Sequence, residues 1–237
     1  MLVGVTQERM TQNIHGLIFD FDGLILDTEE SEFLSWQEMY KEHNAVLSLE
    51  HWAVCIGGSS ELFDVYGHLE EQIGRPVVRE EIAARRRVLH HEMLALKSVL
   101  PGVENYIESA KRLGLKLGVA SSSSRAWVVG HLERLGLYGY FDYIRCGNEV
   151  AHKKPDPELY LAVLDGLGIQ ADEAIALEDS PNGVRAAQRA GIFCVAVPNV
   201  ITGQLNLAHA DLRLSSMADM PLEELIQIAE YRFSENL

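Results

Sequence analysis

Short apolar runs alternate along most of this chain with longer stretches whose apolar residues recur at helical spacing. The apolar runs predict buried strands; one ends at Phe19, and the others occupy residues 115–120, 141–146, 174–177 and 193–197. Helices are predicted at 103–113, 125–135, 157 to 166 or 168, 181–190 and 221–233, with a short element near Leu212. Strands that alternate with helices indicate βαβ units, so we predict an α/β fold with a Rossmann-like, doubly wound parallel sheet.

Two pairs of residues mark the starts of helices in the second half of the chain. Asp156-Pro157 and Ser180-Pro181 each combine a side chain that caps a helix with a proline that suits the first helical position. We therefore expect Asp156 and Ser180 to be N-cap residues.

The first two predicted strands are far apart, and the residues between them have a different character. Residues 29–98 contain many helix formers and few strand-like runs, which predicts a helical insert. The division expected is a core of residues 14–28 and 99–237, an insert of residues 29–98 and an N-terminal extension of residues 1–13. The insert should lie above the ends of the strands.

One helix of the insert is predicted over residues 80–97. Its expected apolar face consists of Ile82, Val88, Leu89, Met93 and Leu96, and its expected solvated face of Arg85, Arg86, Arg87, His90 and His91. The tryptophans Trp36, Trp52 and Trp127 are interpreted as packing residues. In the loop of residues 56–60, residues 57–60 either contact the substrate or form only a turn between helices.

The charge and the cysteines limit the classes of partner and compartment. A net charge of -15 argues against nucleic acid and anionic membranes, since both require a basic surface. Cys55, Cys146 and Cys194 form no CxxC pair, which is typical of reduced thiols in the cytoplasm. We found no apolar run of membrane-spanning length and no signal-peptide pattern, and we expect a cytoplasmic protein that is a monomer rather than an obligate oligomer.

Candidate chemistry gathers where the predicted strands end. Asp20 and Asp22 follow the first strand, Ser121 to Ser124 the second, Lys154 the third, and Glu178 and Asp179 end the fourth. Because the ends of parallel strands share one edge of a sheet, these groups can converge. Asp22-Gly23 alone would be read as a turn, but the whole set favours a site.

Four carboxylates beside one lysine would repel each other or take up protons unless a cation is bound. Oxygen ligands favour Mg²⁺ over zinc, and a Mg²⁺ site with lysine, serine hydroxyls and loop amides suits a phosphoryl group. Asp20 is then the candidate nucleophile, which would form an aspartyl phosphate, and Asp22 the candidate acid and base.

Other residues have supporting roles in this hypothesis. Lys154 would screen the nucleophile, although spacing alone does not separate it from Lys153. Ser121 and the backbone N–H of Ser122 would hold phosphate oxygens at a helix N-terminus. Arg125 either reaches the substrate or only occupies the first turn of its helix, and the last two serines are expected to form a loop and an N-cap.

These motifs, in this order and spacing, resemble the four motifs of the haloacid dehalogenase superfamily. The matching stretches are Asp20-Phe21-Asp22-Gly23 with Asp27-Thr28-Glu29, then Ser121, Lys154-Pro155 and Glu178-Asp179-Ser180. The resemblance implies Mg²⁺ bound by the Asp20 side chain, the Asp22 carbonyl and Asp179, with Glu178 near or among the ligands. The insert resembles the small cap of the β-phosphoglucomutase-like phosphatases, which implies hinges near Thr28 and residues 98–101.

The resemblance and the residues together predict a Mg²⁺-dependent phosphatase that acts on a small phosphorylated metabolite. The second aspartate, Asp22, points to phosphate rather than halide chemistry. Glu32 stands near the position of the mutases' histidine, and residues 58–61 contain no arginine, which favours hydrolysis over phosphosugar mutase activity. A phospho-receiver or binding module that uses the same acidic pocket is the alternative outside the enzymes.

Overall fold

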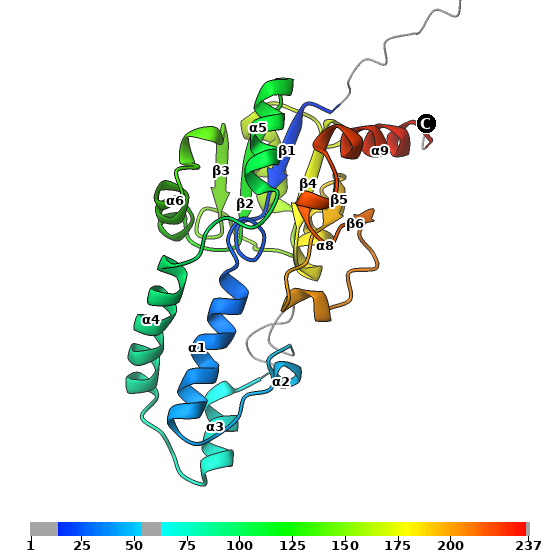
Figure 1. Ribbon diagram of the computed structural model, residues 1–237. Helices are drawn as coiled ribbons and strands as arrows, with labels where there is room; N and C mark the ends of the chain where they lie inside the picture. The colour runs from blue at the N-terminus through cyan, green and yellow to red at the C-terminus, as the bar shows by residue number, and fades with distance from the viewer. Residues whose placement is uncertain (1–13, 54–62, 236–237) are drawn as a thin grey trace, which may run out of the picture.

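A parallel six-stranded sheet forms the centre of the computed structural model, which describes residues 14–53 and 63–235 (Figure 1). Its strands are β1 (Gly16–Phe19), β2 (Lys116–Ser121), β3 (Tyr143–Cys146), β4 (Ala174–Glu178), β5 (Phe193–Ala196) and β6 (Leu212–Arg213). Their order is β3-β2-β1-β4-β5-β6, and every neighbouring pair is parallel. The predicted α/β fold is confirmed.

The strand order places a topological switch point beside β1. From β1 the chain builds β2 and β3 on one side, then returns to build β4, β5 and β6 on the other. The connections leave in opposite directions at the carboxyl ends of β1 and β4, where open α/β sheets form their ligand crevice.

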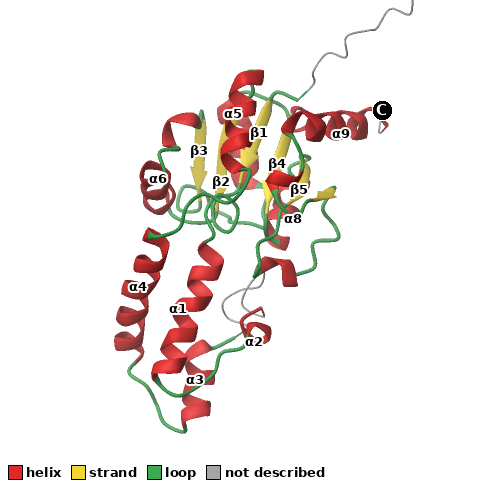
Figure 2. Cartoon of the chain, in the orientation of Figure 1, coloured by secondary structure: helices red, strands yellow, loops and turns green. Residues whose placement is uncertain are grey.

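Helices cover both faces of the sheet because successive strand residues point to opposite sides (Figure 2). Leu17 and Phe19 belong to one core with α5 (Val103–Leu113), α6 (Arg125–Arg134) and α9 (Leu222–Glu235). Ile18, between them, belongs to a second core with α7 (Glu158–Leu167) and α8 (Pro181–Arg189). The remaining short helices are the 3-10 turns η1 (Tyr138–Tyr140), η2 (Ala171–Glu173), η3 (Thr202–Gln204) and η4 (Met217–Asp219).

One of the two predicted caps forms as expected and the other is shifted. The Ser180 side chain accepts a hydrogen bond from Gly183 N at 3.1 Å and caps α8. Helix α7 begins at Glu158, with Pro157 in the cap position, so the prediction that Asp156 is the N-cap was wrong. Asp156 Oδ1 instead accepts from Glu158 N at 3.0 Å, a turn contact that still satisfies one free amide of the first turn.

The insert lies beyond the carboxyl edge of the sheet (Figure 1). It contains α1 (Thr28–Glu42), α2 (Leu49–Ala53), α3 (Val65–Ile73) and α4 (Arg79–Ala95). It has its own apolar cluster, which includes Phe33, Trp36, Met39, Tyr40, Leu69 and Ile82. The boundaries of the core and the insert stay a prediction, and the loop of residues 56–60, Cys55 and residues 1–13 lie outside the described residues.

Helix α4 is oriented differently from the expectation. Val88 and Leu96 are 52% and 90% exposed, whereas the side chains of Arg86 and His90 are only 17% and 14% exposed. Arg86 is buried because its guanidinium lies over the Trp36 ring and contacts Glu32 Oε2 of α1 at 2.6 Å. The apolar periodicity of α4 could not reveal this, since the partners of Arg86 are on another helix.

The chain enters and leaves the insert at two adjacent segments. Leu26 pairs with Val99 in a short antiparallel bridge, and Leu100 N donates to Ile25 O at 2.9 Å. Asp27 caps α1 through Glu30 N, and Lys97 donates to Asp27 Oδ2 at 3.1 Å. The predicted hinge therefore consists of two chain segments that are hydrogen-bonded to each other.

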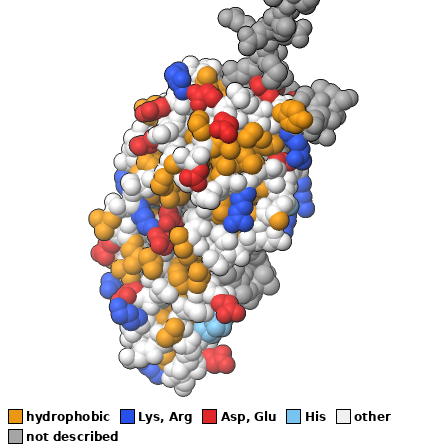
Figure 3. Space-filling model, turned by 45° about the vertical axis from the view of Figure 1, so that its right-hand side comes forward, with side chains coloured by type: hydrophobic (Ala, Val, Ile, Leu, Met, Phe, Trp, Pro, Cys, Tyr) orange, Lys and Arg blue, Asp and Glu red, His pale blue; other side chains and the backbone are white. Residues whose placement is uncertain are grey.

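Charges of both signs share the molecular surface. On the face in Figure 3, Lys and Arg side chains lie among Asp, Glu and apolar side chains. Within the described part of the chain, no helix has both the length and the apolar character that crossing a bilayer requires.

Substitutions of two glycines are expected to have opposite effects on stability, because Gly118 of β2 packs closely against α7 and Gly130 of α6 is exposed. A Cβ at Gly118 would lie 2.5 Å from Val163 Cγ1, so Gly118→Ala should lower the free energy of unfolding by about 1–3 kcal/mol. Gly130, exposed in α6, has no atom within 4 Å of such a Cβ, and Gly130→Ala should raise it by about 0.5–1 kcal/mol. Urea unfolding measures both, and equal effects would contradict the packing described.

Candidate active site

Pairing between β1 and β4 brings three carboxylates together at the switch point. Phe19 lies opposite Leu177, and Asp20 N donates to Leu177 O at 2.9 Å, which carries Asp20 to the level of Glu178 and Asp179. Oxygens of these three carboxylates lie within 4.8 Å of one another, and all three residues are buried. Neighbouring strands alone, without any loop closure, therefore account for the acidic cluster.

Lys154 is the cation of this cluster. Its Nζ donates to Asp20 Oδ1 and to Glu178 Oε1, both at 2.6 Å, and its side chain is 5% exposed. Tyr160 of α7 packs its ring 5.2 Å from Nζ and donates its hydroxyl to Glu178 Oε1 at 2.5 Å. Lys153 is exposed at the cavity edge. The structure thus brings Lys154, not Lys153, to the aspartate.

One lysine does not balance three buried carboxylates. Burial raises the pKa of Asp20 to about 8, because Lys154 opposes the effect only in part and the charges of Glu178 and Asp22 add to it. Burial, followed by the charges of Asp20 and Glu178, raises the pKa of Asp179 well above its usual range. Burial alone would lower the pKa of Lys154, but Asp20 and Glu178 raise it above its usual value.

This donor set fits a hard divalent cation. Asp20 and Asp179 offer closely spaced carboxylate oxygens, and Glu178 stands beside them. Bound Mg²⁺ would stabilise the ionised forms, which burial disfavours, and oxygen-only ligands are those that Mg²⁺ prefers. These residues could therefore hold the metal that the sequence implies.

Gly23 and Asn199 orient Asp179. Gly23 has φ +78°, and a Cβ there would lie 2.1 Å from Asp179 Oδ2, so the turn after Asp22 requires glycine for both conformation and space. Asn199 Nδ2 donates to Gly23 O and to Asp179 Oδ2, both at 3.0 Å. The Asp22-Gly23 turn is thus part of the acidic site rather than an alternative to it.

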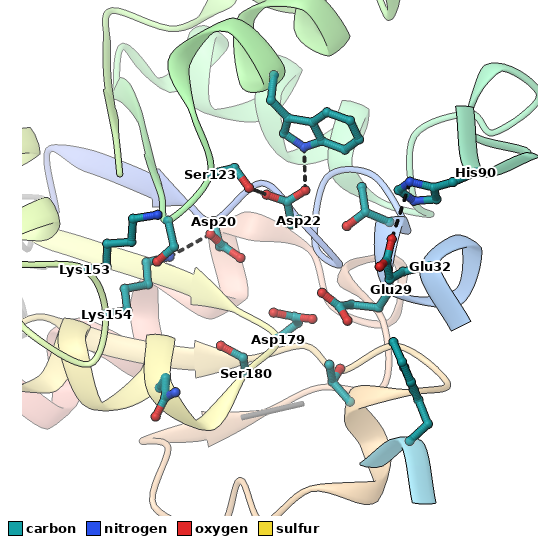
Figure 4. A pocket seen from close by; sticks show the side chains of 16 residues that line it. Asp20, Asp22, Glu29, Glu32, His90, Ser123, Lys153, Lys154, Asp179 and Ser180 are labelled. Carbon is teal, nitrogen blue, oxygen red and sulfur yellow. Dashed lines mark hydrogen bonds and ion pairs between the residues drawn. The ribbon is translucent and has the colours of Figure 1, made fainter. Parts of the chain in front are cut away.

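Asp22 lies apart from the acidic cluster and is held by donors from the region after β2. Ser123 Oγ donates to Asp22 Oδ2 at 2.6 Å (Figure 4). Trp127 Nε1 donates to Oδ1 at 2.8 Å, and Ser121 Oγ donates to Oδ2 at 3.3 Å. The interpretation of Trp127 as a packing residue and of Ser123 as a loop residue was therefore incomplete. Ser124 is the N-cap of α6, as expected.

A cavity of about 540 Å³ opens between the sheet edge and the insert. Its core side includes Asp20, Asp22, Ser122, Ser123, Trp127, Lys153, Lys154, Asp179, Ser180, Asn182 and Thr202, and its insert side Thr28, Glu29, Glu32, Trp52 and His90. Ser122 thus lines the cavity. Ser121 is fully buried beneath it, where its hydroxyl contacts Asp22 and accepts from Ser123 N at 3.0 Å.

Arg125 does not reach this cavity, so its predicted contact with substrate is not supported. Its guanidinium donates to Ile144 O at 3.1 Å and lies 3.4 Å from Glu149 Oε1. Arg125 is the first residue of α6, and its side chain extends toward β3 rather than toward the cavity at the carboxyl edge of the sheet.

Sequence reasoning missed the insert side of the cavity. Burial, with the nearby charges of Asp22, Glu32 and Asp27, raises the pKa of Glu29 to about 7. The His90 ring stacks on Trp127 at 6.0 Å, and burial lowers its pKa although Glu32 opposes this. A signal for Glu29 existed in its place directly after Thr28, but His90 on α4 had none.

Comparisons with known proteins found a family match and similar sequences. The family model described as haloacid dehalogenase-like hydrolase matches residues 17–197. A Bacillus subtilis strain 168 protein named "Putative phosphatase YhcW" is 47% identical over 213 residues, covering 90% of this chain and 96% of its own. The β-phosphoglucomutase of the same strain is 30% identical over 230 residues, covering 93% and 98%.

Similarity extends to a solved structure with a bound ligand. The crystal structure of CbbY from Rhodobacter sphaeroides in complex with phosphate has a TM-score of 0.65 and 29% sequence identity. The aligned region covers 87% of this chain and 96% of the CbbY chain.

The raised pKa of Asp20 predicts how Mg²⁺ and pH act together on stability. Without metal, folding takes up protons at Asp20, so stability should fall as the pH rises from about 4 toward 8. Mg²⁺ must displace that proton, so its apparent affinity should be on the order of 10-fold higher at about pH 8.5 than at about pH 6.5. Thermal unfolding with and without Mg²⁺ at both pH values measures this.

The larger Mg²⁺-induced rise in Tm is expected at the higher pH, and Asp179→Asn should diminish it at both values. A rise that is equal at both pH values, or undiminished in Asp179→Asn, would show that this cluster does not hold the metal.

Proposed function

Because this chain belongs to the haloacid dehalogenase-like hydrolase family, we propose that it is a Mg²⁺-dependent phosphomonoester hydrolase acting on a small phosphorylated metabolite through an aspartyl-phosphate intermediate. The observation that carries the proposal is the convergence of Asp20, Lys154, Glu178 and Asp179, of which all but the buried Glu178 line one cavity. The match of residues 17–197 to the family and the 47% identity to YhcW support the class of phosphatase.

Asp20 is the proposed nucleophile. A carboxylate oxygen of Asp20 attacks phosphorus, the bond from phosphorus to the ester oxygen breaks, and an aspartyl phosphate forms. Lys154 holds Asp20 Oδ1 at 2.6 Å and thereby fixes the plane of the carboxylate before the attack. Water then attacks the same phosphorus, which releases phosphate and restores the Asp20 carboxylate.

Asp22 is the proposed acid and base. It gives a proton to the leaving ester oxygen in the first step and takes one from the attacking water in the second. Trp127 and Ser123 hold its two carboxylate oxygens, so rotation toward the phosphate requires that these hydrogen bonds open. Asp22 lines the same cavity as Asp20, which supports a shared role.

The metal and the phosphate would lie on the core side of the cavity. The Asp20 and Asp179 carboxylates and the Asp22 carbonyl would hold Mg²⁺, which when bound neutralises the charge of the transferring phosphoryl group. Ser122, at the cavity edge, would offer its backbone N–H to the phosphate, and Ser121 would hold Asp22 from below. Closure of the insert as a cap about the Leu26–Val99 segments would exclude water during phosphoryl transfer.

Two alternatives predict different products. A phosphosugar mutase would return the phosphoryl group to its substrate, so the products of glucose 1-phosphate with a bisphosphate activator distinguish it from a phosphatase. Glu32 paired with Arg86 supports hydrolysis, since this ion pair occupies the guanidinium that could otherwise bind a second phosphate. A phospho-receiver would release no phosphate over repeated turnovers and would leave Asp22 without a role.

The proposal extends to the setting of the enzyme. We expect a monomer in the cytoplasm that acts on a metabolite. The net charge of -15 argues against nucleic acid and anionic membranes as partners. The free, buried thiols of Cys146 and Cys194 support a reducing compartment.

Replacing the nucleophile tests the proposal directly. Asp20→Asn keeps the shape of the side chain but loses its nucleophilic oxygen charge, so kcat/KM for an aryl phosphate with Mg²⁺ should fall by at least about 10³-fold. Asp165→Asn, an exposed substitution on α7, is the matched control and should retain full activity. Substantial Mg²⁺-dependent phosphate release by Asp20→Asn would disprove the covalent mechanism.

A further inference from the structure

The insert side of the cavity differs in chemistry from the core side. It is lined by Thr28 and Glu29 at the start of α1, Glu32 one turn later, Trp52 of α2 and His90 of α4. The lining on this side thus holds two carboxyl groups and, among the described residues, no lysine or arginine. Figure 4 shows Glu29, Glu32 and His90 across the cavity from Lys153 and Lys154.

Three residues on this side carry polar atoms that lack a protein partner. Thr28 Oγ1, Trp52 Nε1 and His90 Nε2 are buried, and the described chain supplies no hydrogen bond to any of them. Thr28 and Trp52 are 5% and 6% exposed. Buried polar groups are costly when unsatisfied, so three of them around one cavity indicate a polar ligand that completes their hydrogen bonds.

The cation nearest to this side is already committed. Arg86 contacts Glu32 Oε2 at 2.6 Å, lies over the Trp36 ring and is outside the cavity lining. Burial lowers the pKa of His90, although the charge of Glu32 opposes this, so burial disfavours the charged form of this side chain. Among the described lining residues, the insert side therefore offers hydrogen-bonding groups but no unpaired positive charge.

We propose that this half of the cavity is a leaving-group subsite for an uncharged, hydroxyl-bearing carbon skeleton, and that Glu29 and Glu32 exclude substrates with a second anionic group. The inference rests on the proposed function, since the phosphate must occupy the core side. Hydroxyls can both donate to the Glu29 and Glu32 carboxylates and satisfy Thr28 Oγ1, Trp52 Nε1 and His90 Nε2. The aromatic rings of Trp52 and Trp127 supply apolar walls for the carbon skeleton.

A second phosphate or a carboxylate would meet the wrong charge. Placed beside Glu29 and Glu32, it would be repelled, because Arg86 balances only one of these two carboxylates. Within the described lining, the lysines are Lys153 and Lys154, both on the core side. Lys154 is occupied by Asp20 and Glu178. Like charges brought together in an interface are unfavourable, so we expect the enzyme to select for the neutral skeleton.

A matched pair of substrates tests this selectivity. Sorbitol 6-phosphate and 6-phosphogluconate carry the same phosphate and the same six-carbon chain, but the far end is a hydroxymethyl group in one and a carboxylate in the other. We expect kcat/KM of the native enzyme, measured at about pH 8 so that Glu29 is largely ionised, to be at least ~10-fold higher for sorbitol 6-phosphate.

Two variants connect the selectivity to its cause. Glu29→Gln removes one repelling charge, so the ratio of the two kcat/KM values should fall by about 3-fold or more. Glu32→Gln also frees Arg86, which can then attract the carboxylate, so the ratio should fall further or invert. Glu38→Gln, on the same helix but outside the cavity lining, is the matched control and should leave the ratio unchanged.

Each outcome separates this inference from the proposed function. Equal or faster hydrolysis of 6-phosphogluconate by the native enzyme, or a ratio that neither variant changes, overturns the subsite. If the enzyme hydrolyses an aryl phosphate but neither sorbitol 6-phosphate nor 6-phosphogluconate, the subsite is also overturned, while the phosphatase function stands. Loss of activity on the aryl phosphate as well would reject the proposed function itself.

Discussion

The buried contact of Lys154 with Asp20 and Glu178 is the interaction on which the site depends. Two carboxylates and an ammonium group lie within hydrogen-bonding distance in a place nearly closed to water. Removing one partner of such a group leaves an uncompensated charge, which typically costs about 3–5 kcal/mol. Because Asp179 adds a third carboxylate, the cluster still carries excess negative charge, and that excess makes it suited to a metal and a phosphoryl group.

The sheet and the insert form opposite sides of the cavity. The adjacent ends of β1 and β4 bring the three carboxylates together on the core side, and Lys154 and Asn199 hold their side chains. Helices α1 and α4 bring Glu29, Glu32 and His90 to the opposite side, and the ring of His90 stacks on Trp127, which also holds Asp22. The Trp127 indole therefore contacts both the insert and the proposed acid, Asp22. A movement of the insert that shifts this indole would also change its hydrogen bond to Asp22.

Residues whose roles follow from strand ends could be found from the sequence, and residues whose roles follow from helix packing could not. Asp20, Asp22, Lys154, Glu178 and Asp179 were identified because the ends of parallel strands must share an edge. Trp127 and His90 were read as packing and solvated residues, since helical periodicity does not say which tertiary partner a side chain meets. Arg125 shows the same limit in reverse, because its proximity to Ser122 in sequence did not bring it to the cavity.

The sequence by itself determined the parallel sheet, the existence of the helical insert and the acidic cluster, since each follows from apolar periodicity and from carboxylates placed at the ends of buried runs. Tertiary structure alone decided which side chains line the insert side, that Arg86 forms an ion pair with Glu32, and that Trp127 holds Asp22. Those contacts join residues 51 to 105 positions apart, each with a residue of a helix on one side, and the placement of those helices depends on packing between surfaces that no local pattern encodes.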